Sequence, residues 1–296
     1  MTALLGLIHG LDFLLTSFLI GVVVFHTLIS KAGGPESASL SLNWPRRVAT
    51  LIFLTFLSSL TWMLFTANDM VESWQPNDLW VAMSQTRFGH TWCFRLVLLF
   101  LLFIGIRFVK KSRMRTLGFM CLTLLVPIFS SLSGHAGANE KQLFLHVAID
   151  WGHSVAVGIW TGGLWALRAW LGNRIASNHF GIESGRLVVK RFSEFAMAST
   201  AVIMVTGIVM TYFAGVSFRH PWETNYGALV LGKLLLFCAA LVAAAINQFL
   251  HLRKWDIEND RRATLSVRRE VTLELVFIVI IFGVAGFLTR AALPVG

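Results

Sequence analysis

Three side chains on one apolar segment could together bind a metal ion: His146, Asp150 and His153. Because an α-helix turns by about 100° per residue, these positions fall within roughly 60° of one another on one helix face. They spread over only about 10 Å along the axis, at 1.5 Å of rise per residue. Two imidazoles and a carboxylate on an apolar helix are costly in a membrane unless they are used. The pattern therefore indicates a functional site.

Imidazole chemistry makes a metal the first ligand to consider, because neutral histidine suits copper, zinc, iron and nickel. Copper(I) would add methionine or cysteine to histidine, whereas copper(II) would add oxygen ligands, and the spacing leaves both forms open. His135, in a polar loop before the helix, and His9, near the start of the chain, are further candidate ligands. The possible accessory residues are Asp12, His90, Lys233, Met204 and Met210. For any single histidine, hydrogen bonding to a helix end is the competing interpretation.

The chain that carries these residues has the composition of a membrane protein. Of its 296 residues, 56% are hydrophobic and 14% are charged, whereas a soluble domain carries about 25% charged residues. Apolar runs of about 20 residues, the length that a bilayer requires, predict eight transmembrane helices in one all-α domain over residues 1–296. The predicted spans are residues 4–29, 48–68, 91–108, 116–132, 143–171, 193–214, 228–250 and 271–293. The first run is longer than the apolar part of a signal peptide, so we expect it to be retained.

The basic residues predict how these helices are oriented. The net charge of +10 could suggest nucleic acid as a partner, but most lysines and arginines lie in the loops after the first, third, fifth and seventh spans. This distribution follows the positive-inside rule, so these loops should be cytoplasmic and the partner should be the lipid bilayer, with no nucleic acid. Both termini are then predicted to be periplasmic. The His135 loop and the helix ends that carry His9 and His146 would face the same side.

Small and polar residues within the spans suggest further contacts. Gly158 and Gly162, four residues apart, should allow another helix to approach the fifth span closely. Lys233 either extends to the outer interface or pairs with a carboxylate such as Asp150. The methionines of the sixth span could form a path for a soft metal, although methionine is also a common filler of apolar space. The sequence leaves open whether the first and fifth spans are neighbours, and a shared site needs that contact.

Several enzyme signatures are missing from the sequence. It contains no GxxxxGK[ST] phosphate-binding loop, no HExxH motif and no Ser–His–Asp arrangement. We therefore expect no enzymatic activity. Any transport would be passive, coupled to an ion, or driven by hand-off from a partner.

A series of short motifs runs through nearly the whole chain. They are LIHGLDF, QTRFGHTW, SGHA, an H-x-x-x-D-x-x-H helix ending in WTGGL, RFSEFA with a following TG, NYGALVLGK and LTRAALP. In their order and placement they resemble the copper resistance D (CopD/PcoD) family of bacterial inner-membrane proteins. The resemblance implies copper homeostasis by copper binding and transport, with import as the expected direction. It also implies a separate periplasmic CopC-type copper-binding partner, and the ligands His9, His135, His146, Asp150 and His153.

Two other functions fit the same residues. Histidines on the first and fifth spans could ligate a haem b between helices, which would make the chain a membrane redox protein. Such a haem needs no CxxCH motif. Alternatively, the chain could be a scaffold that binds a periplasmic copper chaperone and transports nothing.

Overall fold

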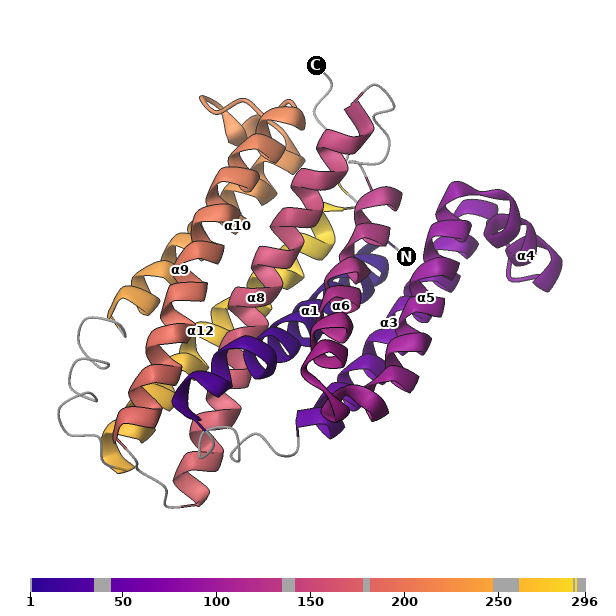
Figure 1. Cartoon of the computed structure of the whole chain (residues 1–296). Helices are drawn as coiled ribbons and strands as arrows, with labels where there is room; N and C mark the ends of the chain where they lie inside the picture. The colour runs from indigo at the N-terminus through magenta and orange to yellow at the C-terminus, as the bar shows by residue number, and fades with distance from the viewer. Residues whose placement is uncertain are drawn as a thin grey trace.

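The computed structural model describes residues 2–34, 44–134, 142–177, 182–246, 261–289 and 291. Regular structure in these ranges is entirely helical (Figure 1). The α-helices are α1 (Thr2–Val24), α3 (Trp44–Val71), α4 (Pro76–Gln85), α5 (Arg87–Gly105), α6 (Arg113–Ser133), α8 (Leu143–Ala176), α9 (Ile182–Phe213), α10 (Asn225–Ile246) and α12 (Arg261–Leu288). A π-helical turn at Phe25–Ile29 and 3-10 turns at Ser30–Gly33, Ile106–Lys111 and Pro221–Glu223 complete the fold.

Eight helical segments are long and apolar enough to cross a membrane, which confirms the predicted all-α class with eight spans. They are Ala3–Gly33, Trp44–Val71, Arg87–Val109, Arg113–Ser133, Leu143–Ala176, Gly185–Phe213, Asn225–Ile246 and Thr264–Leu288. The fifth helix continues to Ala176, beyond the predicted end at residue 171, and Arg174 in this extension is buried. The sixth and eighth segments begin at Gly185 and Thr264, whereas residues 193 and 271 were predicted. The remaining helix, α4, is too short to span a bilayer.

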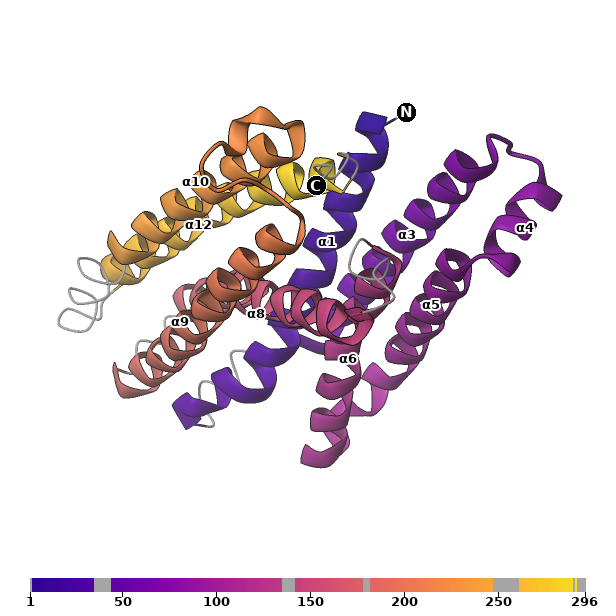
Figure 2. The same cartoon turned by 90° about the horizontal axis from the view of Figure 1, so that it is seen from above.

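α1 lies in the middle of the bundle. Viewed from above, it runs between α3, α5 and α6 on one side and α9, α10 and α12 on the other, and α8 crosses it (Figure 2). It packs against α3, α6, α8 and α12. Its buried residues, among them Leu19, Val22 and Val23, join those of α8, such as Trp160 and Trp170, in the main hydrophobic core.

The first and fifth spans are neighbours, and glycines bring them into contact. A methyl group added at Gly21 of α1 would overlap the backbone of Gly162 and Gly163 on α8, and one added at Gly162 would overlap the carbonyl of Ser17. Gly158 lies against Ile20 one turn away. In lipid, where apolar surfaces gain little by packing, such close backbone approach is a main source of helix association. The close approach predicted for Gly158 and Gly162 is confirmed.

We expect Gly162→Ala to destabilise the bundle by about 1–3 kcal/mol, because the added methyl group must push α1 away from α8. Gly152→Ala is the matched control, since a methyl group at Gly152 of the same helix meets no other atom within 4 Å. That control should be neutral or slightly stabilising, because alanine favours helices over glycine. Thermal unfolding of both variants in detergent measures the difference. Equal stabilities would show that the α1–α8 contact tolerates a wider spacing.

Candidate functional site on α8

The polar stripe of α8 faces α9. The imidazole of His146 stacks on the ring of Phe213, with centroids 4.2 Å apart and an interplanar angle of 11°. The Nδ1 atom of His153 lies 2.8 Å from the Oγ1 atom of Thr206. The two contacts are seven residues apart on each helix and occur in opposite order, so α8 and α9 run antiparallel along the stripe. Two turns of α8 therefore carry both histidines on the same face, with Asp150 between them.

Thr206 determines which nitrogen of His153 is available. Its hydroxyl donates to the carbonyl of Val202, 2.5 Å away in the preceding turn. The hydroxyl oxygen then accepts the hydrogen bond from Nδ1–H of His153, because a hydroxyl has one proton to donate. That tautomer leaves the lone pair of Nε2 free to bind a metal, which is how a hydrogen-bonded neighbour usually orients a histidine ligand. This role of Thr206 was not predicted from the sequence, where its signal is a threonine within an apolar span.

α10 adds a cation and a phenol to the stripe. The carboxylate of Asp150 interacts electrostatically with the ammonium of Lys233 and with the hydroxyl of Tyr226. Lys233 also interacts electrostatically with the imidazole of His153. Lys233 thus lies within electrostatic range of Asp150, as one of its two interpretations requires. The stripe is therefore a charged site between three helices, in which a lysine already compensates the carboxylate.

His9 lies in an aromatic setting on the other side of α1. Its ring meets Phe13, Trp62 and Trp92 edge to face, at centroid distances of 4.2, 4.0 and 6.5 Å. Within the described ranges, no three histidine, cysteine, aspartate or glutamate side chains are arranged to hold a metal ion. His146, Asp150 and His153 therefore share one face of α8 without converging on a common metal position, and His9 is not added to them. His135 lies outside the described residues.

The other accessory candidates lie apart from the stripe. His90 is exposed, and its Nε2 atom lies 2.6 Å from the carbonyl oxygen of Ser84, which joins α5 to α4. Met197 and Met204 are exposed on the surface of α9, and Met210 is half-buried. A methionine path would therefore follow the outside of α9 more than its contact with α8.

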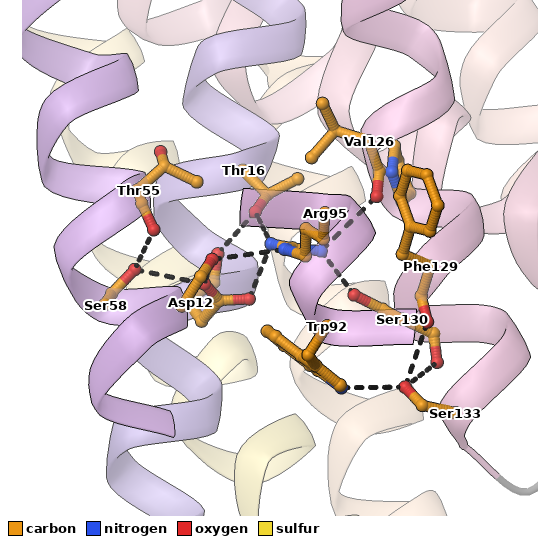
Figure 3. Close-up of polar contacts among 12 residues, drawn as sticks. Asp12, Thr16, Thr55, Ser58, Trp92, Arg95, Val126, Phe129, Ser130 and Ser133 are labelled. Carbon is orange, nitrogen blue, oxygen red and sulfur yellow. Dashed lines mark hydrogen bonds and ion pairs between the residues drawn. The ribbon is translucent and has the colours of Figure 1, made fainter. Parts of the chain in front are cut away.

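Asp12, a further accessory candidate, belongs to a buried ion pair (Figure 3). Its Oδ2 atom accepts a hydrogen bond from Nη2 of Arg95 at 2.7 Å, and both side chains are 0% exposed. Its Oδ1 atom accepts from the hydroxyls of Ser58 and Ser59, at 3.1 and 2.6 Å. Both carboxylate oxygens are already engaged, so Asp12 is better suited to hold Arg95 than to ligate a metal.

The guanidinium of Arg95 has an acceptor for each of its five N–H groups. These acceptors are Asp12 Oδ2 and Thr16 Oγ1 on α1, Ser59 Oγ on α3, and Ser130 Oγ and the Val126 carbonyl on α6. One side chain of α5 thus joins four helices, as Figure 3 shows in part. The pairing of Asp12 with Arg95 was not predicted from the sequence. The sequence feature that indicates such a pair is an arginine and an aspartate that each lie inside an apolar span, because buried charges need partners.

Comparison with known proteins gives two family matches. Residues 1–144 match the family described as copper resistance protein D-like, N-terminal domain, and residues 186–288 match copper resistance protein D. The Asp12–Arg95 pair lies in the first range, and Thr206 and Lys233 lie in the second. The polar stripe of α8 lies between the two ranges.

Three curated relatives are similar over much of the chain. Copper resistance protein D of Pseudomonas syringae pv. tomato is 25% identical over 286 residues, which cover 91% of this chain and 90% of that protein. Copper transport protein CutJ of Bacillus subtilis (strain 168) is 28% identical over 190 residues, 62% of this chain but only 34% of that protein. Inner membrane protein YebZ of Escherichia coli (strain K12) is 26% identical over 197 residues, 65% of this chain and 64% of that protein. No solved structure matches the chain.

Proposed function

Because the chain belongs to the copper resistance protein D family and is a multi-pass protein of the bacterial inner membrane, we propose that it binds periplasmic copper and carries it inward. The site of capture is the stripe of His146, Asp150 and His153, with His135, which precedes α8 in the sequence, as a further ligand. A separate CopC-type protein would deliver the ion. His9 would be a further ligand only if copper binding moved its side chain towards α8.

The observation that carries this proposal is the environment of the two α8 histidines. Thr206 holds His153 in the tautomer whose Nε2 atom can coordinate a metal. The Nε2 atom of His146 is buried and has no hydrogen-bond partner among the described residues. An unsatisfied ring nitrogen inside a bilayer is costly. A metal ion at the stripe would satisfy it, and Asp150 would balance the ion's charge.

The first test is the metal content and visible spectrum of the purified protein. We expect stoichiometric copper and no Soret band, followed by copper uptake into vesicles that contain the protein. A Soret band with iron would assign the histidines to haem b instead. Absence of metal, together with intact binding of a periplasmic copper chaperone and unchanged cellular copper on deletion, would identify a scaffold.

Lys233 should compete with copper for Asp150. We expect Lys233→Met to raise the copper affinity by about tenfold, which corresponds to ~1.4 kcal/mol, because the ion no longer displaces a resident cation. Lys190→Met, at an exposed position of α9, is the control and should leave the affinity unchanged. Titration of both variants with copper against a coloured chelator measures the effect. Weaker binding in the Lys233 variant would instead show that the lysine orders the site.

A further inference from the structure

The end of α1 opposite to His9 has an unusual backbone. The helix continues from Val24 into the π-helical turn Phe25–Ile29, which buries Phe25, His26, Thr27 and Ile29. π-Helical turns are rare and are frequent at functional sites. His26 lies 17 residues after His9, which corresponds to about 25 Å along the helix. α1 therefore carries one buried imidazole near each side of the membrane.

The imidazole of His26 is enclosed in aromatic side chains. It is only 6% exposed. It stacks on Trp44 of α3, with centroids 5.5 Å apart and 20° between the planes, and meets Phe25 edge to face at 5.4 Å. Its Nδ1 atom is buried and has no hydrogen-bond partner in the described part of the chain. The hydroxyl of Thr27, the next residue, is also buried and also lacks a hydrogen-bond partner among the described residues.

In this respect His26 differs from two other buried polar side chains of the bundle, His153 and Arg95. His153 is hydrogen-bonded to Thr206, and Arg95 has an acceptor for every N–H group. A buried polar atom without a partner costs free energy, and a ligand that the site binds can recover it. A ring nitrogen with an available lone pair, enclosed by aromatic rings, is suited to a metal ion of the kind that imidazole binds.

A neighbouring cation limits how strongly this site can hold a metal. Arg47 lies one turn after Trp44 on α3 and acts electrostatically on His26. Its Nη2 atom is held 3.4 Å from Oδ1 of Asn173 on α8. A positive charge beside the imidazole disfavours a bound cation and favours an anionic acceptor. Conduction needs such weak sites, because an ion that binds too tightly does not leave.

We propose that His26 is a second copper ligand, at the inner end of α1, from which the ion passes to an anionic acceptor in the cytoplasm. This inference rests on the proposed function for the identity and direction of the ion. The imidazole of His26 supplies one ligand of an incomplete coordination sphere. Water, or the ligand that takes the ion away, completes it.

The test is a titration of the purified protein with copper(I) alone, under reducing conditions, against an anionic chelator. His153→Ala removes the α8 site, and the weaker binding that remains should belong to His26. Adding His26→Phe, which keeps a ring to stack on Trp44, should weaken that binding by tenfold or more. Adding Arg47→Gln should instead tighten it several-fold. Thermal unfolding checks that each variant folds, and His26→Gln replaces the phenylalanine variant if it does not.

The outcomes separate this proposal from the function on which it rests. If His153→Ala binds copper as the unmodified protein does, the α8 site is wrong, while the effect of His26→Phe still tests the inner site. If adding His26→Phe to His153→Ala leaves the titration curve unchanged, the inner site is wrong. It is also wrong if His153→Ala retains no copper. Tightening by Arg47→Gln that requires His26 supports the release role.

Discussion

Arg95→Met is expected to destabilise the protein by about 3–5 kcal/mol, the largest loss among the single substitutions considered. The substitution leaves the carboxylate of Asp12 buried without a counter-ion, and breaking a buried pair from one side carries a penalty of this size. It also removes hydrogen bonds from the guanidinium to α1, α3 and α6. The four helices should then separate more easily, and thermal unfolding in detergent should show the loss.

The double variant Asp12→Asn/Arg95→Met distinguishes charge from packing. With both charges gone, no ion is left unpaired, so stability should recover in part, because apolar replacements of buried pairs are often tolerated. Arg107→Met is the control, since this arginine is exposed just after α5, and it should change stability little. A double variant less stable than Arg95→Met would show that Asp12 is held mainly by Ser58 and Ser59 and not by the arginine.

His153→Ala is expected to abolish tight copper binding at the α8 stripe, leaving only the weaker binding assigned to His26, while the protein stays folded. The side chain supplies the Nε2 lone pair that Thr206 orients, and His146 with Asp150 leaves too few ligands for a stable site. Thr206→Val should act through the same atom. Without an acceptor for Nδ1–H, the ring loses its fixed tautomer, and loss of such a partner typically weakens metal binding by about 10- to 100-fold.

The controls for this prediction are available on the same chain. His220→Ala changes an exposed histidine that lies 3.9 Å from Glu223 in the loop before α10, and its copper content should equal that of the unmodified protein. Metal analysis after gel filtration, with thermal unfolding for each variant, provides the measurement. Unchanged copper stoichiometry in His153→Ala would exclude the α8 stripe as the binding site, whatever the protein transports.

The ion pair and the α8 stripe suggest that different regions around α1 provide stability and metal binding. Asp12 joins α1 to α3, α5 and α6 through Arg95, whereas Gly21 joins the same helix to α8 at Gly162. The first contact is polar and saturated, and the second consists of backbone approach without side chains. Variants at Arg95 should therefore lower stability, while variants at His153 should lower metal binding. Measuring both quantities for both variants tests whether the two regions are independent.

The eight helices and the polar stripe of α8 could be predicted from the order of residues alone. A bilayer requires about 20 apolar residues per span, so composition along the chain identifies each helix. Helical periodicity places His146, Asp150 and His153 on one face, because residues three, four and seven apart share a side of the helix. These properties are local, and the structure has the same helices, with ends that differ from the predicted ones by up to eight residues, at the start of the sixth span (residue 185 against the predicted 193).

Which side chains contact one another depends on which helices pack together, and periodicity within one helix does not contain that information. Asp12 was expected beside a metal, but the fold brings Arg95 to it from a helix more than 80 residues away. His26 was not among the candidate ligands predicted from the sequence. It is a candidate because the structure buries it in a π-helical turn and stacks it on Trp44. In lipid, most apolar helix faces could pack equally well. Close glycine contacts and buried polar pairs between helices choose among these arrangements, and they form only in the assembled bundle.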